Sequence, residues 1–374
     1  MRDLVVVSGY YGFANLGDEA ILEQLTNELK RLVPASKIVI LSNRPHETQR
    51  LYGVRAVNRW SLPALAGLLP KTRLFVSGGG GLMQDTRSAG SPIYYGGQIL
   101  MARALGARTI VYCQGLGPLR SAIARIACRA ALTLCEAISV RDDQSLLLAE
   151  GWGLKAERSA DPVWGLDATA LPEQVLSQLA MLKAAGGSGA PPLIGLSLRE
   201  SAQFNADYLQ ALDQALADAL PAEACLLLLP LQKDMDEPLL DQFGQLWMRR
   251  GRKFDKIDPL ALERPSQWIS LMSELDFLVA MRLHALIMAL RQGVPVVGLA
   301  YDPKVTFVLR DFDQTILNLT KEAAKDDWKT LIKQAFLGRA ELSKQAIAKA
   351  ASAKDLSCQN FNLLARILGM QSDS

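Results

Sequence analysis

The stretch Asp276-Phe-Leu-Val-Ala-Met-Arg-Leu-His-Ala-Leu-Ile-Met-Ala-Leu290 decides the fold class of this chain. Its apolar run at 277–280 has no polar alternation, which is typical of a strand buried on both faces of a parallel sheet. A helix is predicted to start near Leu283, so Arg282 and His284 stand at the join. Ligands of open α/β sheets bind at such joins, and a helix N-terminus favours an anion. The stretch therefore predicts an anion site in an α/β fold.

A structural interpretation of the same two residues stays open at this point. Arg282 can pair with a nearby carboxylate, and His284 can cap the helix or pack against it. The chain has one other histidine, His46, which lies in a polar stretch that predicts exposure. The two interpretations are separated only by the pattern of the remaining chain.

Strands and helices alternate on both sides of this stretch. A chain of 374 residues is long for one core, so two domains are expected. The alternation predicts an α/β fold of two doubly wound, Rossmann-like domains that face a cleft. The other expected strands cover residues 4–9, 37–42, 73–77, 108–113, 137–142, 193–199, 224–229 and 294–299.

The best candidate for a linker is a cluster of glycine, serine and proline at about 181–192. This composition is typical of flexible connections. We therefore expect an N-terminal domain of residues 1–180 and a C-terminal domain of residues 191–374. The second domain includes a mostly helical tail, 321–370, which is expected to wrap back over a domain.

Composition and charge argue against several classes of protein. The net charge of +3 is too small and too evenly spread for nucleic-acid binding. The five cysteines form no C-x-x-C pair, so they predict buried thiols of a reducing cytoplasm, and neither a zinc site nor a disulfide frame. No signal peptide is visible, and no stretch reaches the ~20 apolar residues of a membrane span. Residues 121–140 come closest, but Arg125, Arg129 and Glu136 interrupt them and predict an amphipathic helix.

Two glycine-containing loops follow predicted strands near the N-terminus. Neither is a G-x-G-x-x-G or P-loop motif. Their polar groups can face a hydroxylated ligand, but helix capping and a tight turn explain them as well. The candidate residues in these loops are Asn15, Asp18, Glu19, Gly79, Gly80 and Asp85.

Two further cations stand at predicted strand ends. Arg141 ends the strand at 137–142, and Lys304 follows the strand at 294–299. Lys304 can reach the same crevice as Arg282, because neighbouring parallel strands end at one edge of a sheet. Arg141 can instead pair with an aspartate that follows it, and Lys304 can be a solvated lysine at a helix start.

Seven motifs, taken in order, match one family over most of the chain up to about Val305. On these motifs the chain resembles the polysaccharide pyruvyl transferases, particularly the bacterial cell-wall polymer enzymes linked to S-layer anchoring. One departure is Ala14, where the family often has glycine and a compatible backbone angle is needed. The motifs are Gly9-Tyr-Tyr-Gly-Phe-Ala-Asn-Leu-Gly-Asp-Glu-Ala20, Ser77-Gly-Gly-Gly-Gly-Leu-Met-Gln-Asp85, Gln114-Gly-Leu-Gly-Pro118, Ser139-Val-Arg-Asp142, Ala160-Asp-Pro-Val163, Met281-Arg-Leu-His-Ala285 and Tyr301-Asp-Pro-Lys-Val305.

The resemblance implies a GT-B-like architecture and a transfer of pyruvyl from phosphoenolpyruvate to two hydroxyls of one sugar, which forms a ketal and releases phosphate. It assigns phosphoenolpyruvate binding to Arg141, Arg282 and Lys304, and general acid catalysis to His284. It implies no metal and no redox cofactor. The N-terminal loops with Asn15, Asp18, Glu19, Gly79, Gly80 and Asp85 would face the acceptor sugar.

Two other functions remain open on the sequence. One is a GT-B-like glycosyltransferase that uses a nucleotide sugar, and the other is a non-catalytic protein that binds a glycan or an anion. The expected location is the cytoplasm. If the acceptor is linked to a lipid, the helix at 121–135 with Arg125 and Arg129 is a candidate for peripheral contact with the inner face of the membrane.

Overall fold

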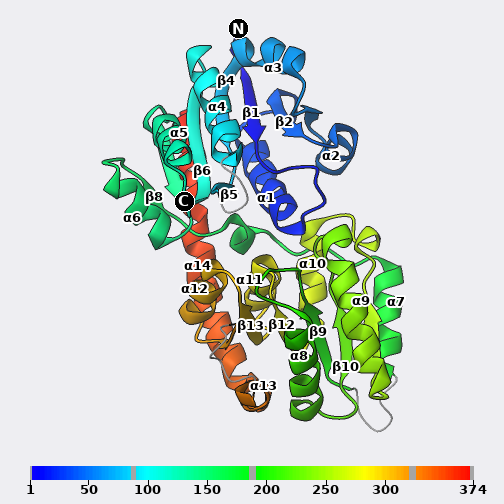
Figure 1. Ribbon diagram of the computed structural model, residues 1–374. Coiled ribbons are helices and arrows are strands. Elements are labelled where there is room, and N and C mark those ends of the chain that lie inside the picture. The colour runs from blue at the N-terminus through cyan, green and yellow to red at the C-terminus, as the bar shows by residue number, and fades with distance from the viewer. Residues whose placement is uncertain (1, 86–89, 185–190, 320–325, 371–374) are drawn as a thin grey trace. The chain divides into compact units, whose positions relative to one another are not determined.

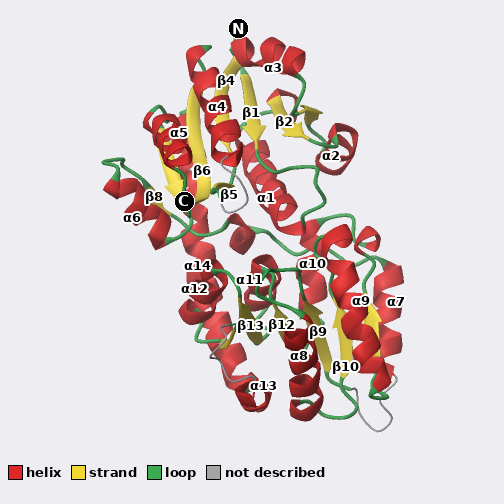
Figure 2. Ribbon diagram, viewed as in Figure 1, coloured by secondary structure: helices red, strands yellow, loops and turns green. Residues whose placement is uncertain are grey.

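The computed structural model describes residues 2–85, 90–184, 191–319 and 326–370 (Figure 1). The chain forms two compact units. Unit 1 comprises Met1–Leu166 and Ala353–Ser374, and unit 2 comprises Asp167–Ser352. Each unit carries its own parallel sheet (Figure 2).

The sheet of unit 1 has eight strands, in the order β3-β2-β1-β4-β6-β7-β8, with β5 paired to β6. All pairings are parallel. The strands are β1 Leu4–Ser8, β2 Ile38–Ser42, β3 Arg55–Asn58, β4 Thr72–Ser77, β5 Gly80–Met83, β6 Arg108–Leu116, β7 Ala137–Val140 and β8 Glu157–Arg158.

Helices cover both faces of this sheet because successive strand residues point to opposite faces. Val5 and Val7 pack with α1 (Leu16–Leu32), α2 (Pro45–Tyr52) and the end of α14 (Arg339–Leu368). Val6 packs in a separate cluster on the other face. That cluster includes side chains from the helices α3 Leu62–Leu68, α4 Gly90–Ala104, α5 Ala122–Thr133 and α6 Asp143–Gly151.

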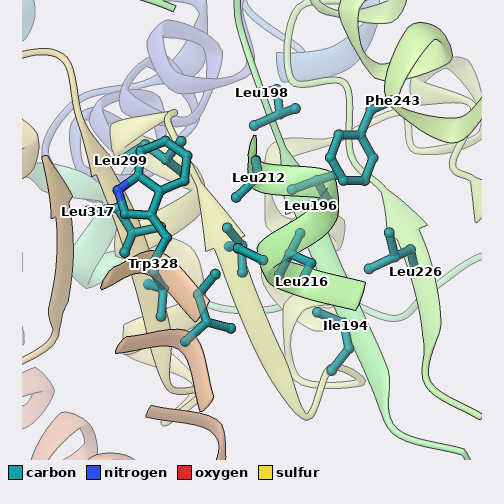
Figure 3. Close-up of a cluster of buried hydrophobic side chains, with 14 of the residues drawn as sticks. Ile194, Leu196, Leu198, Leu212, Leu216, Leu226, Phe243, Leu299, Leu317 and Trp328 are labelled. Carbon is teal, nitrogen blue, oxygen red and sulfur yellow. The ribbon is translucent and has the colours of Figure 1, made fainter. Parts of the chain in front are cut away.

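The sheet of unit 2 has six parallel strands, in the order β11-β10-β9-β12-β13-β14. Leu-rich strand faces pack with α8 (Ala206–Ala219), α9 (Lys233–Arg249) and α13 (Asp326–Leu337), as Figure 3 shows for Leu196, Leu212 and Trp328. The strands are β9 Leu193–Ser197, β10 Cys225–Leu228, β11 Phe254–Lys256, β12 Phe277–Ala280, β13 Val296–Ala300 and β14 Thr315–Asn318. The helices are α7 Glu173–Ala184, α8 Ala206–Ala219, α9 Lys233–Arg249, α10 Pro265–Met272, α11 Leu283–Arg291, α12 Pro303–Asp311 and α13 Asp326–Leu337.

Both sheets have the Rossmann-like order that creates a topological switch point. In unit 1 the chain leaves β1 in one direction and returns on its other side at β4. In unit 2 the same reversal occurs between β9 and β12. Ligands of open α/β sheets bind beside such a point, at the carboxyl ends of the strands. The carboxyl edge of each sheet is therefore where a site is sought.

The two units divide at Leu166 and not in the expected linker at 181–192, of which residues 185–190 lie outside the described part of the chain. The cause is α7, which is held by unit 2: Gln178 Nε2 donates to Asp255 Oδ2 over 2.9 Å, and Lys183 pairs with Glu274 at 2.6 Å. The expected domains 1–180 and 191–374 are corrected accordingly.

The helical tail also departs from the expected domains. It returns to unit 1, because Leu364 and Ile367 of α14 are buried against the sheet there. Asn360 anchors it: its Nδ2 donates to the Ala160 carbonyl over 2.9 Å, and its Oδ1 accepts from Ser159 Oγ over 2.7 Å. The last turns of the chain therefore complete the core of the first unit, which confirms that the tail wraps back over a domain.

The expected strands are present, and β12 covers the predicted residues 277–280. The run of four glycines at 78–81 differs from the expected loop, because Gly80 and Gly81 begin β5 and Gly80 pairs with Gln114 of β6. Gly80 has a φ of +110°, and a Cβ there would lie 3.0 Å from an Asp18 carboxylate oxygen. The glycine thus lets a strand pass directly over a polar side chain.

Candidate functional site

Cations gather at the carboxyl edge of the unit 2 sheet. Arg199 follows β9, Arg282 and His284 follow β12, and Lys304 follows β13. These three strands are neighbours, with Ser197 paired to Ala280 and Ala280 paired to Gly298. Parallel neighbours end at one edge, so the structure brings these side chains to the switch point of unit 2.

Arg282 is a buried cation held by a buried carboxylate. Its Nε donates to Asp236 Oδ2 over 3.0 Å, and its Nη2 donates to Asp236 Oδ1. Asp236, in the first turn of α9, also accepts from the Gln232 backbone N–H over 2.9 Å. Burial raises the pKa of the Asp236 carboxyl, and the Arg282 charge opposes that rise. The alternative that Arg282 pairs with a carboxylate is therefore confirmed, and the pair fixes the guanidinium at the strand end.

Arg199 is a second cation beside this pair. Its Nη1 donates to the Tyr301 hydroxyl over 3.2 Å, and its guanidinium carbon lies 5.3 Å from the centre of the Tyr301 ring. Burial raises the pKa of Tyr301, while the charges of Arg199 and Arg282 lower it. The charge of Arg199 also acts on Asp236. Arg282 pairs directly with Asp236, whereas Arg199 bonds to the neutral Tyr301 hydroxyl and only adds its charge to the surroundings of that carboxylate.

The N-terminus of α11 adds to that charge. Its N-cap is Arg282, which provides no side-chain acceptor for the first amides. By contrast, Asp302 caps α12 by accepting from the Lys304 backbone N–H over 2.9 Å. His284 is the second residue of α11 and is half-buried, and the Lys304 side chain is half-buried in the first turn of α12. Positive partial charges at a helix start favour an anion.

The polar residues at the start of α1 organise the first glycine loop. Asn15 caps the helix, because its Oδ1 accepts from the Gly17 N–H over 3.2 Å. Glu19 accepts from the Gly12 N–H over 2.7 Å. Burial of the Glu19 carboxyl raises its pKa to about 8. The capping alternative is confirmed for Asn15, and Glu19 holds the loop closed.

Tyr11 packs against the ends of β1 and β4, the two strands that flank the switch point of unit 1. Its side chain is fully buried, and a Cβ on Gly9 or on Gly78 would lie within about 2 Å of it, so only glycine fits at both strand ends. Burial raises the pKa of Tyr11, and the Asp18 carboxylate adds to that rise. Gly79 packs against Ile21 of α1 in the same way. The glycines of this edge therefore serve close packing of α1 and its loop on the sheet.

Arg141 and Asp85 occupy a second place on the same edge. Arg141 Nη1 donates to Asp161 Oδ2 over 2.8 Å, and both side chains are buried. Burial by itself would lower the pKa of Arg141, but the charges of Asp161 and Asp142 together with the hydrogen bond to Asp161 raise it. Asp85 accepts from the backbone N–H groups of Arg120 and Ser121, which lowers the pKa of its carboxyl. Hydrogen bonds thus join Arg141 to Asp161, and Asp85 to the backbone of Arg120 and Ser121, across 20 to 36 positions of the sequence.

The structure brings Arg282, His284 and Lys304 to one edge of unit 2 and leaves Arg141 in unit 1. Arg141 belongs to the other unit, so its part in phosphoenolpyruvate binding stays a prediction. Sequence reasoning missed Asp236, which lies 46 residues before its partner in no recognised motif. It also passed over Arg199, although the predicted strand 193–199 ended on that residue.

Two further properties concern the whole described chain. No helix among the described residues is long and apolar enough to cross a membrane. No group of three or more histidine, cysteine, aspartate or glutamate side chains there is placed to hold a metal ion. The amphipathic helix expected at 121–135 is α5, on which Ile123 and Ile126 are exposed together with Arg125 and Arg129.

A sequence model of the family described as polysaccharide pyruvyl transferase matches residues 15–303. The chain belongs to the polysaccharide pyruvyl transferase family. The matched segment includes Asn15 and Glu19 at the start of α1, the Arg141 motif, and Arg199, Arg282 and His284 of unit 2, and Lys304 follows directly after it. No curated protein sequence matches the chain.

Solved structures with the same fold include glycosyltransferases of the GT-B type and a protein assigned as a UDP-N-acetylglucosamine 2-epimerase. Anabaena Alr3699/HepE in complex with UDP-glucose is 13% identical, covers 98% of this chain and 99% of its own, and has a TM-score of 0.62. A glycosyltransferase from Rickettsia africae is 10% identical over 100% of both chains, with a TM-score of 0.65. WaaG, a glycosyltransferase of lipopolysaccharide biosynthesis, is 12% identical over 98% of this chain and 100% of its own, with a TM-score of 0.53. The expected GT-B-like fold is confirmed.

Proposed function

We propose that this family member transfers pyruvyl from phosphoenolpyruvate to two hydroxyls of a sugar in a cell-surface polysaccharide or its precursor. The observation that carries the proposal is the cation cluster of Arg199, Arg282 and Lys304 at the unit 2 switch point, beside the imidazole of His284. Phosphoenolpyruvate carries a carboxylate and a phosphate, and such a donor needs several cations to hold it.

The reaction needs one proton donor and no electron transfer. His284 gives a proton to the methylene carbon of phosphoenolpyruvate, which becomes the methyl group. One sugar hydroxyl adds to the neighbouring carbon and loses its proton. The bond from that carbon to the phosphate oxygen then breaks, and phosphate leaves. The second hydroxyl adds at the same carbon and loses its proton, which closes the cyclic ketal.

Each cation has a distinct part in this proposal. Arg282, fixed by Asp236, and Arg199, fixed on Tyr301, bind the anionic groups of the donor in a set orientation. Lys304 neutralises charge that develops on the leaving phosphate. Arg141 contributes to donor binding by the resemblance of its motif, which is a further proposal and rests on no contact in unit 2.

Calorimetric titration with phosphoenolpyruvate tests the donor site. Lys304→Gln is the sharpest variant, because the side chain is half-buried at a helix start and its loss should leave the fold intact. Lys344→Gln is the matched control, since Lys344 lies on the exposed surface of α14 in the same unit. Wild type and the control should bind, and Lys304→Gln should bind at least tenfold more weakly. Equal binding by both variants contradicts the assignment of Lys304.

A nucleotide-sugar glycosyltransferase is the second candidate, favoured by the likeness of the fold to a structure solved with UDP-glucose. Thermal unfolding separates the two functions. Protection by phosphoenolpyruvate supports pyruvyl transfer, whereas protection by UDP-glucose alone supports the rival. If neither ligand protects and no phosphate is released with any acceptor, the chain is a non-catalytic glycan-binding or anion-binding protein.

We also propose that α5 contacts an anionic membrane surface. Ile123 and Ile126 are exposed, and Arg125 and Arg129 lie on the same helix. Apolar side chains flanked by arginine suit a surface of anionic lipids. Sedimentation with phosphatidylglycerol vesicles, compared between wild type and a variant with both isoleucines changed to serine, tests this contact.

A further inference from the structure

Arg59 joins three segments at the carboxyl edge of the unit 1 sheet. It follows β3 and is only 3% exposed. Its Nη1 donates to the Gly9 carbonyl over 2.7 Å, and its Nη2 donates to the Tyr95 hydroxyl over 2.9 Å. The Tyr94 hydroxyl accepts from Nε over 3.3 Å and donates to the Arg59 carbonyl over 3.1 Å. These bonds tie the ends of β1 and β3 to α4.

Aromatic rings surround this guanidinium. Its central carbon lies between 4.8 and 5.3 Å from the ring centres of Phe13, Trp60, Tyr94 and Tyr95. Cation–π attraction is significant within about 6 Å. No carboxylate of the described residues pairs with Arg59, so π-faces and hydroxyl groups offset its charge. The arrangement fixes the positions of the rings around one buried cation.

The outer rings form an exposed surface, which we call the aromatic platform and define as Tyr10, Phe13, Trp60 and Tyr94. Tyr10 stacks on Phe13 with ring centres 4.1 Å apart, and Trp60 lies 4.9 Å from Tyr94. Trp60 is 57% exposed, and the other three are half-buried. A large aromatic side chain left exposed over a rigid support is not needed for core packing and indicates a binding surface.

The platform lies where a ligand of unit 1 is expected. Tyr10 and Phe13 come from the loop after β1, one of the two strands that flank the switch point. The face of an aromatic ring is negative and attracts the partly positive C–H groups of a sugar ring. Rigid aromatic rings also lose little conformational entropy on binding. Arg59 is buried beneath the rings, so the faces of the platform themselves offer no exposed cation to a phosphate or carboxylate.

We propose that the aromatic platform binds a pyranose ring of the saccharide acceptor. The identification of that saccharide as the acceptor rests on the proposed function, whereas binding of a pyranose ring does not. Arg59 is a positioning residue in this proposal, because it holds the rings and does not touch the sugar. The indole of Trp60 provides the most exposed stacking face.

Saturation-transfer NMR on the full chain tests this site without requiring turnover. The probes are the methyl glycosides of glucose, galactose, mannose, N-acetylglucosamine and N-acetylmannosamine. Wild type should bind at least one of them, and Trp60→Ala should weaken that binding at least tenfold, while Trp60→Phe should retain most of it. Leu62→Ala is the matched control, since Leu62 is 70% exposed two residues away. It should bind as wild type does.

Three outcomes overturn the proposal: no glycoside binds wild type, Trp60→Ala binds equally well, or Leu62→Ala loses as much affinity as Trp60→Ala. A parallel titration of wild type and of Trp60→Ala with phosphoenolpyruvate separates this site from the proposed function. Loss of glycoside binding supports the platform even where phosphoenolpyruvate fails to bind wild type, which would count against pyruvyl transfer alone.

Discussion

Removing the Arg282 side chain is expected to destabilise unit 2 as well as to weaken donor binding. Arg282→Met keeps most of the side-chain volume. It leaves the fully buried carboxylate of Asp236 with a hydrogen bond from the Gln232 backbone N–H but without its cationic partner. Two unit charges 3.0 Å apart attract by about 5.5 kcal/mol at an effective dielectric constant of about 20. Breaking a buried pair costs about 3–5 kcal/mol. We expect a loss near 3 kcal/mol, because the nearby charge of Arg199 remains.

Urea unfolding of a double-mutant cycle measures this coupling. Asp236→Asn removes the buried charge, so the double variant should be at least 1 kcal/mol more stable than the sum of the two single losses predicts. The penalty of Arg282→Met should also shrink as the pH falls. Burial already raises the pKa of Asp236, and losing Arg282 raises it further, so the folded variant takes up a proton at low pH.

Two results would refute this reasoning. One is a loss below 1 kcal/mol in Arg282→Met, and the other is additivity of the two single substitutions. Either would mean that water or a rearranged Arg199 solvates Asp236. The cycle also matters for function, because a donor titration of any Arg282 variant has to be read beside its stability.

Three other predictions follow from single positions. His284→Gln should lower phosphoenolpyruvate-dependent phosphate release by about 10²–10⁴ while donor binding persists; unchanged turnover would remove His284 as the acid. Glu19→Gln should stabilise unit 1 increasingly from about pH 5 to 8, by up to about 1.4 kcal/mol per pH unit, and the gain should level off at higher pH. The reason is that the raised pKa of about 8 makes the folded wild type lose stability as the pH rises to that value. A pH-independent difference in urea unfolding would contradict this. Ala14→Gly should raise the melting temperature by about 2 °C, since Ala14 has a φ of +54°, and a lower melting temperature would show that the strain is absent.

The strands and the polar strand ends could be predicted from the sequence because both are local properties. The apolar run at 277–280 specifies a buried strand wherever it is placed, and Arg282 and His284 then stand at its end. The partners of these residues could not be predicted. Asp236 meets Arg282 only because β9, β10 and β12 assemble into one sheet and place the start of α9 beside β12.

The domain boundary could not be predicted from the sequence either. The glycine, serine and proline cluster at 181–192 is a sound local signal of a linker. Where a unit ends, however, depends on which surfaces become buried together, and α7 finds its partners Asp255 and Glu274 in unit 2. The end of α14 has its partners in unit 1, where Asn360 accepts a hydrogen bond from Ser159, 201 positions earlier in the chain.

The sequence by itself determined the alternation of strands and helices, the glycines at the strand ends and the family motifs, since periodicity and backbone freedom are encoded within a few residues. The tertiary structure alone decided which charges neutralise one another and which stay in excess. It joined Arg59 to rings from the loop after β1 and from α4, and it paired Arg282 with Asp236 while Arg199 bonded to Tyr301. Such groupings depend on contacts between distant segments, whose free energy exists only once the sheet has formed.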